Sequence, residues 1–223
     1  MNHQLADVIK SGAVTIAALL PIVNPIGSAP IFLSMSADLP AAGRRQLARL
    51  VARNAYVLLA GAMLIGSQVL RIFGISLPIV RVAGGLLVAA NGWHLINADE
   101  TQSSPNPPVS DAWERAIATR AFFPLTFPLT VGPGSVSIAI TLGARESFTG
   151  TSSAINLGTD LIAVGIVALV VYLSYRFASR LITYLGETGT VVFLRLSAFI
   201  LMCVGVSIIW SGIVDLIQPL LPR

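Results

Sequence analysis

The sequence predicts an all-α polytopic membrane protein, with six transmembrane helices arranged as two inverted three-helix repeats in which helices one and four are broken. Three observations lead to this prediction: a very apolar composition, six long stretches without charged residues, and two matching clusters of proline. Of the 223 residues, 55% are hydrophobic and 11% are charged, and the mean hydropathy is +0.81. Soluble domains usually carry about 25% charged residues, so we expect a bilayer as the solvent.

The charged and metal-binding residues exclude several classes of protein. Fourteen Lys and Arg against ten Asp and Glu give a net charge of +4, which in a membrane protein reports topology rather than nucleic acid binding. The single Cys203 cannot form an internal disulfide, and His3 and His94 lack the spacing of metal ligands. We therefore expect no nucleic acid partner, no metal and no cofactor.

Six stretches free of Asp, Glu, Lys and Arg are the predicted spans. Interfacial arginines with long side chains extend the shorter ones toward the ~20 residues that cross a bilayer core. Helices are expected because a backbone in lipid must satisfy its own polar groups, and the first stretch carries no cleavage site that would remove it. The stretches are 11–37, 54–70, 82–98, 121–144, 161–175 and 196–214.

Two clusters of proline divide the chain into related halves. Both clusters have spacings of four and five residues, and each proline of the first lies 103 positions before its counterpart. The pairs are Pro21 and Pro124, Pro25 and Pro128, and Pro30 and Pro133. The halves are predicted at 1–97 and 116–223, joined by a polar cytoplasmic linker rich in Pro and Ser at 98–115. An odd number of helices per half inverts the second copy, as in many secondary transporters.

The basic residues at the span ends predict the orientation. The side of the first, third and fifth loops carries nine Arg and the other side carries five Lys or Arg, which places both termini outside the cell. The nine are Arg44, Arg45, Arg49, Arg53, Arg115, Arg120, Arg176, Arg180 and Arg195; the five are Lys10, Arg71, Arg81, Arg145 and Arg223.

The first and fourth spans are predicted to be broken helices. They contain PIVNPIGSAP at 21–30 and PLTFPLTVGPGS at 124–135, in which proline removes amide donors and glycine permits unusual backbone conformations. Asn24 followed by Pro25 is typical of an N-cap and a first helical residue, and Ser28 or Ser135 would cap the next segment in the same way. Such a break needs protein or a wet cavity around it.

Each break would present a helix N-terminus near the middle of the bilayer, where free N–H groups favour an anionic group such as a solute carboxylate. The alternative is a simple kink, because Pro and Gly are common in membrane helices. The residues predicted to bind a solute are Asn24, Pro25, Gly27, Ser28, Thr130, Gly132, Gly134 and Ser135.

Three stretches carry a resemblance to a known family: NPIGSAPIFL at 24–33, FPLTVGPG at 127–134 and RVAGG at 81–85. Together with the length and the six-span layout, they resemble the MarC family of bacterial integral membrane proteins over nearly the whole chain. Some relatives in that family are described as transporters of small neutral amino acids. The resemblance therefore implies a multi-pass transporter of the bacterial inner (cytoplasmic) membrane and leaves its solute open.

We expect a transporter that works by alternating access on a small polar or zwitterionic solute, such as a small neutral amino acid. The alternative is a membrane scaffold or partner-binding protein without transport activity. A hydrolase using Ser135 with His94 as base is disfavoured, since nothing in the sequence brings the two together, and we expect no enzyme. The partners are the solute and the lipid bilayer, and the sequence is compatible with a homo-oligomer.

The remaining small and polar residues are assigned to packing or to the membrane interface. Arg81 is expected to extend to the headgroups, and Asn91 and His94 to lie at the interface. Trp93, Trp113 and Trp210 are expected as interfacial anchors. The small residues expected where helices approach closely are Gly61, Gly84, Gly85, Ala89, Ser207 and Ser211.

Overall fold

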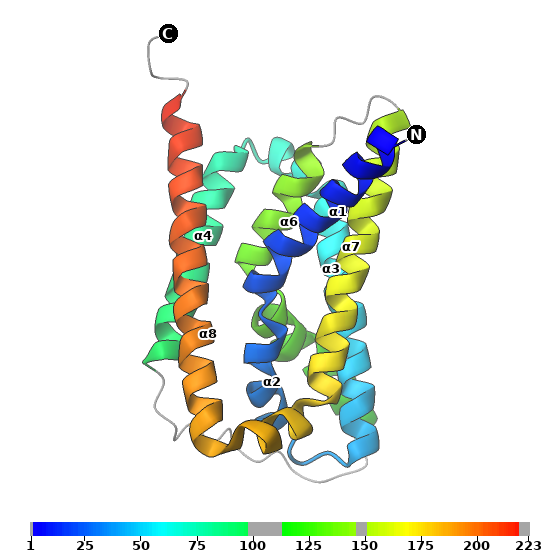
Figure 1. The fold of residues 1–223 in the computed structure, drawn as a ribbon, viewed down its shortest axis with the longest axis vertical. Helices are drawn as coiled ribbons and strands as arrows, with labels where there is room; N and C mark the ends of the chain where they lie inside the picture. Colours follow the sequence, from blue (N-terminus) through cyan, green and yellow to red (C-terminus); the bar gives the residue numbers. More distant parts are fainter. Residues whose placement is uncertain (1, 98–112, 146–150, 219–223) are drawn as a thin grey trace.

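The computed structural model describes residues 2–97, 113–145 and 151–218, and all regular structure in these ranges is helical (Figure 1). Residues 98–112 of the predicted linker lie outside the described residues. The last three linker residues, 113–115, belong to a helix. The elements are α1 (Asn2–Val23), α2 (Pro25–Ser34), α3 (Ala41–Ile72), α4 (Leu77–Ile96), α5 (Trp113–Arg120), η1 (Ala121–Thr130), α6 (Pro133–Arg145), α7 (Thr151–Arg176) and α8 (Ala178–Ile217).

Among the described residues, four helical stretches are long and apolar enough to cross a membrane, and one bent pair makes a fifth. The four are Ile9–Leu33, Ala41–Ile72, Ile155–Arg176 and Val191–Ile217, and the pair is Ile117–Thr130 with Pro133–Ala144, bent by 74°. The prediction of an all-helical membrane protein is thus confirmed. The predicted six transmembrane helices are not, because α4 is not among the candidate spans. Helix α1 begins and α8 ends at the same end of the bundle (Figure 1).

The first break lies at Asn24, between α1 and α2. Asn24 has φ 42° and ψ 56°, and its side chain accepts a hydrogen bond from the Gly27 amide at 3.2 Å. Pro25 follows as the first residue of α2, so the predicted N-cap and helix start are confirmed. The Ser28 amide donates to the Asn24 carbonyl at 3.0 Å. Ser28 therefore lies inside α2, and its predicted role as a cap is wrong.

The second break is longer and begins inside η1. Phe123 and Phe127 have extended dihedral angles, near φ −120° and ψ 125°, because the proline that follows each of them disfavours the helical region. The hydroxyls of Thr126 and Thr130 donate to the carbonyls five residues before them, at 2.5 and 2.6 Å. These two bonds provide partners for carbonyls of an irregular segment, as an apolar environment requires.

Helix α6 starts after this segment, at Pro133. Ser135 was predicted as a cap, but its hydroxyl donates to the Gly132 carbonyl at 2.8 Å instead of accepting from an amide. The helices that follow the two breaks begin at Pro25 and Pro133, which are 108 positions apart. The constant offset of 103, which pairs Pro25 with Pro128, therefore does not align the breaks, because Pro128 lies inside the longer second one.

Helices α4 and α8 pack antiparallel along a seam of glycines. A Cβ built on Gly85 would lie 2.8 Å from the Gly205 carbonyl oxygen, and a Cβ on Gly205 would lie 2.4 Å from the Ala89 amide. Gly92 and Gly212 repeat such approaches seven residues further along each helix, so the backbones touch over several turns. Gly84, Gly85 and Ala89 therefore lie where helices approach closely, as the sequence predicted.

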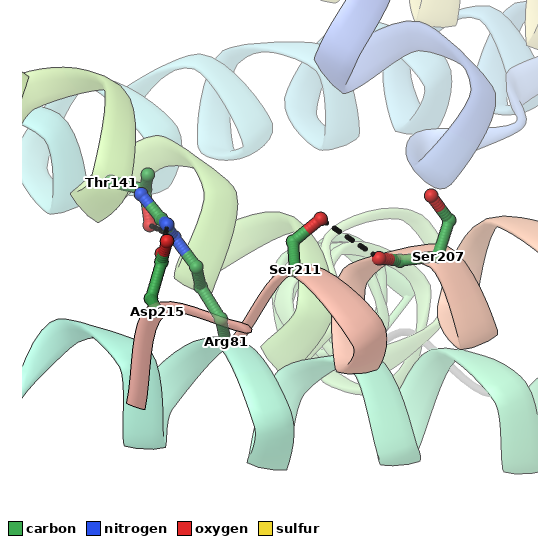
Figure 2. A network of polar contacts seen from close by, with 5 residues as sticks. All are labelled: Arg81, Thr141, Ser207, Ser211 and Asp215. Carbon is green, nitrogen blue, oxygen red and sulfur yellow. Dashed lines mark hydrogen bonds and ion pairs between the residues drawn. The ribbon is translucent and has the colours of Figure 1, made fainter. Parts of the chain in front are cut away.

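Three other residues predicted at packing faces do not lie there. Ser207 and Ser211 are exposed, and the Ser211 hydroxyl donates to the Ser207 carbonyl at 3.0 Å on α8 itself (Figure 2). Gly61 has no atom within 4 Å of the place of a Cβ. The seam uses the other face of α8, on which the glycines are seven residues apart.

Helix contacts in the two halves correspond to one another. We match α1, α2, α3 and α4 of the first half with η1, α6, α7 and α8 of the second. Under this match, the contact of α3 with α6 corresponds to that of α7 with α2, and the contact of α4 with α6 corresponds to that of α8 with α2. The contact of α1 with α7 likewise corresponds to that of η1 with α3. Two further contacts, α3 with α7 and α4 with α8, join equivalent elements. The buried core lies between α3, α7 and the broken helices, and includes Leu19, Phe32, Leu47, Val51, Leu59, Met63, Leu125, Val164 and Val167.

Candidate functional site

A cavity of about 440 Å³ lies against both helix breaks. Seven of the eight residues predicted to bind a solute line it, whereas Pro25 is buried at the start of α2 and does not. The lining residues are Ile22, Val23, Asn24, Gly27, Ser28, Ile31, Met35, Val88, Asn91, His94, Pro124, Pro128, Leu129, Thr130, Gly132, Gly134, Ser135 and Leu201. The structure thus brings together two motifs about 100 residues apart in the sequence.

The lining of this central cavity is mainly apolar, with a few polar side chains, and it holds no Asp, Glu, Lys or Arg. Its hydroxyls come from both halves, with Ser28 on α2, Thr130 on η1 and Ser135 on α6, and all three are buried. Hydroxyls and free carbonyls bind polar groups without adding net charge. A solute without net charge therefore suits the cavity best.

The two helix starts at the cavity differ chemically. The first turn of α2 is occupied by its own cap, since the Asn24 side chain accepts from Gly27. Before α6, Gly132 occupies the cap position and has no side chain that accepts a hydrogen bond. The first amides of a helix have no partner within it, so Gly134 and Ser135 offer donors that an anionic group can use.

Tyr175, near the end of α7, contacts both breaks. Its hydroxyl lies 2.7 Å from Thr130 Oγ1 and also interacts with the Ser28 side chain. Its ring stacks on Phe32 of α2, with centroids 4.4 Å apart and planes at 12°. Sequence reasoning missed this residue, which merely ends an uncharged run, because only the packing of α7 between the halves places it there.

Asn91 and His94 of α4 also line the cavity, although the sequence analysis assigned them to the interface. They are three residues apart and so share one helix face, which was the signal available in the sequence. His94 and Ser135 therefore line one cavity. Among the described residues, however, no hydrogen bond joins them, and the Ser135 hydroxyl donates to Gly132.

Glycines allow close approach around the cavity at two places. A Cβ on Gly27 would lie 2.4 Å from the Asn24 side chain and would displace the cap. A Cβ on Gly134 would lie 1.9 Å from Val88, so this glycine lets α6 approach α4. At Gly132 the nearest atom is the Pro128 carbonyl oxygen at 3.3 Å, and a small side chain there needs only a slight shift.

Two further polar clusters lie away from the cavity. Arg81 of α4 forms an ion pair with Asp215 of α8, and its Nε donates to Thr141 of α6 at 3.3 Å (Figure 2). Arg81 thus joins three helices rather than only extending to the headgroups. The second cluster joins α7 and α1, where buried Asp160 accepts hydrogen bonds from Ser11 at 2.9 Å and from Thr15 at 2.8 Å.

Comparison with known proteins supports one family. The profile described as "MarC family integral membrane protein" matches residues 9–217. The chain is 28% identical to the inner membrane protein MarC of Escherichia coli strain K12 and to that of Shigella flexneri, over 96% of this chain and 99% of each relative. No solved structure matches the chain. Because the profile covers nearly all of it, the chain belongs to the MarC family of integral membrane proteins.

Proposed function

We propose that this protein transports a small zwitterionic solute, such as a small neutral amino acid, across the membrane by alternating access. The observation that carries the proposal is the central cavity of about 440 Å³ at which both broken helices meet. Irregular backbone in a membrane is tolerated where it is buried in protein or lines a cavity, and transporters bind their solutes at such breaks.

The solute's carboxylate would bind at the start of α6. Gly134 and Ser135 of the first turn of α6 line the cavity. Free amides and the positive end of a helix dipole stabilise an anionic group by about 0.3 to 1 kcal/mol, and by up to ~2 kcal/mol when partly buried. The ammonium group needs acceptors, and carbonyl and hydroxyl oxygens of η1 and α2, including Thr130 and Ser28, line the same space. Both ends of a zwitterion are thereby matched.

The architecture that we propose has six crossings in two inverted repeats, with α4 as the crossing beyond the five candidates. Its 20 residues span about 30 Å at 1.5 Å per residue, the thickness of a hydrocarbon core. Support comes from the glycine seam along α8 and from the matched helix contacts of the two halves. Alternating access then amounts to rocking one half against the other.

The location that we propose is the bacterial inner membrane, with both termini outside. The relatives are named as inner membrane proteins. The arginines of the α3 start and of the α7–α8 junction lie at the end of the bundle opposite to the start of α1 (Figure 1). A basic end facing the cytoplasm follows the positive-inside tendency.

A scaffold needs no polar cavity, and the hydroxyl-lined space at both breaks therefore favours transport. We also propose that the protein is not an enzyme. A serine nucleophile needs a base within hydrogen-bonding distance, and the Ser135 hydroxyl is directed to a backbone carbonyl. No residue of the lining supplies a carboxylate for acid–base chemistry.

The test is counterflow of labelled neutral amino acids in proteoliposomes, with two matched serine variants on α6. Ser135 and Ser137 are both buried and both donate to a carbonyl, at 2.8 and 2.9 Å, but only Ser135 lines the cavity. Each Ala variant loses one hydrogen bond of roughly 1 kcal/mol. Ser135→Ala should reduce flux severalfold, whereas Ser137→Ala should retain it.

Equal flux in both serine variants would contradict the assignment of the cavity as the solute path. Counterflow of no member of the neutral amino acid panel, with protein that is folded and correctly inserted, would favour the scaffold alternative. A panel of charged amino acids serves as the reference, because a lining without charged residues should disfavour them.

A further inference from the structure

Four arginines surround a second cavity, at the end of the bundle where α3 begins and α7 gives way to α8. The cavity has a volume of about 300 Å³, and its lining includes Arg44, Arg45, Arg176 and Arg180. It is separate from the central cavity, with which it shares no lining residue. Sequence analysis used these arginines only to predict topology.

Among the described residues, these four arginines form no ion pair with a carboxylate. In the ranges that the structure describes, the ion pairs are those of Arg81 with Asp215 and Arg120 with Asp38, and neither involves the cavity. Four like charges around one small space repel one another. An anion that enters the space would relieve this repulsion and would accept hydrogen bonds from several guanidinium groups.

Aromatic rings hold two of the arginines in place. The Arg176 guanidinium lies 5.4 Å from the Phe177 ring centroid and 5.7 Å from that of Tyr172, and Arg180 lies 5.6 Å from Phe177. Arg176 also donates from Nη1 to the Tyr172 hydroxyl at 3.0 Å, and a guanidinium that lies on an aromatic face has further N–H groups for an anion. The start of α3 adds its own donors, because Pro40 at the cap position supplies no side-chain bond to the first amides and Ala41 lines the cavity.

The position of the cavity favours a lipid over a soluble anion. The candidate span of α7 ends at Arg176, and we expect the guanidinium groups at this end to lie at the level of the headgroups. Beyond it, α8 bends at Gly186 (φ 66°), and its first part runs across the end of the bundle (Figure 1). Phe177 is 40% and Tyr184 is 93% exposed there, as expected for residues at a membrane interface.

We infer that this arginine cavity binds the phosphate group of an anionic phospholipid. Guanidinium groups match phosphate oxygens in pairs, and basic pockets between helices on the cytoplasmic side are suited to such headgroups. The site is independent of solute binding in the central cavity. It would fix the junction of α7 and α8 to the membrane surface.

The test uses the full-length protein in a mild detergent and native mass spectrometry. Phosphatidylglycerol and phosphatidylcholine with the same acyl chains compete for binding. The wild type should prefer phosphatidylglycerol about tenfold, as one or two charge-assisted hydrogen bonds allow. Arg176→Gln/Arg180→Gln should lose most of this preference. The control Lys10→Gln/Arg71→Gln removes the same charge from exposed positions elsewhere and should keep it.

Two results with the variants would overturn the inference: an unchanged preference in Arg176→Gln/Arg180→Gln, or an equal loss in the control. Arg176→Lys/Arg180→Lys retains the charge and guards against misfolding; it should keep part of the preference while losing the paired geometry. Inorganic phosphate forms a separate arm. If millimolar phosphate displaces phosphatidylglycerol and raises the melting temperature as much as the lipid does, the lipid assignment is overturned in favour of a soluble anion.

Discussion

The Tyr175 hydroxyl lies 2.7 Å from Thr130 Oγ1, and the Thr130 hydroxyl in turn donates to the Leu125 carbonyl at 2.6 Å. Thr130 has a single proton to give, so Tyr175 is the donor in this pair. The same hydroxyl contacts Ser28 of the other break. One side chain of α7 therefore couples the irregular segments of both halves.

Tyr175→Phe should impair transport more than stability. The variant keeps the ring that stacks on Phe32 and loses only the hydroxyl, so unfolding should become easier by about 1 kcal/mol. Thr130 and Ser28 would lose their common partner, and counterflow in proteoliposomes should fall severalfold. Tyr184→Phe is the control, because Tyr184 is 93% exposed. Flux at the wild-type level in Tyr175→Phe would show that the bridge is only structural.

The sequence predicted the two breaks well because their signals are local. Asn is favoured at the N-cap and Pro at the first helical position, and the structure confirms both roles for Asn24 and Pro25. The partners of the breaks are not local. Tyr175 and His94 come from α7 and α4, and only the packing of these helices brings them to the breaks. The spacing of Asn91 and His94 indicates a shared helix face, but nothing in the sequence indicates that this face packs against the breaks.

The glycine seam gives a second prediction. Gly205→Val should strongly destabilise the protein, because its Cβ would lie 2.4 Å from the Ala89 amide and the two backbones would have to separate. Overpacking of this kind typically costs about 1 to 3 kcal/mol, or more. Thermal unfolding in detergent, followed by light scattering and fluorescence, measures the effect.

The matched control for the seam is Gly61→Val. Gly61 is also inside a membrane helix, but no atom lies within 4 Å of the place of its Cβ. Its melting temperature should remain near that of the wild type, since Val in a helix costs no more than Gly. Equal destabilisation of the two variants would mean that a valine anywhere in these helices, and not the contact between α4 and α8, determines the result.

Register explains why the repeat was predicted only approximately. The proline spacing suggested one offset of 103, yet the helices after the breaks start 108 positions apart. The difference arises in η1, where Phe123 and Phe127 leave the helical region before their prolines and lengthen the second break. Matching prolines can therefore occupy different structural positions, and counting them does not reveal which one begins a helix.

The protein has six crossings if α4 spans the membrane and five if it does not. Labelling the two ends of α4 gives a third prediction. Ser76 precedes α4 and Asn97 follows it. Single cysteines at these positions, in a Cys203→Ser background, should react with a membrane-impermeant thiol reagent from opposite sides of the membrane: Ser76→Cys from outside and Asn97→Cys from the cytoplasm. Labelling of both from one side would show that α4 does not cross, and the proposed inverted repeat would then be wrong.

The last prediction concerns Arg81, which joins three helices. Its partner Asp215 lies on α8, and the two side chains are 20% and 37% exposed, so solvent weakens their attraction and a coupling energy of about 0.5 to 1 kcal/mol is expected. A double-mutant cycle with Arg81→Gln and Asp215→Asn, followed by unfolding in mixed micelles, measures it. Neither residue lines the central cavity, so Arg81→Lys, which keeps the charge, should transport normally. A coupling energy near zero would show that the ion pair does not stabilise the contact between α4 and α8. A loss of flux in well-folded Arg81→Lys would place Arg81 on the solute path, although it does not line the central cavity.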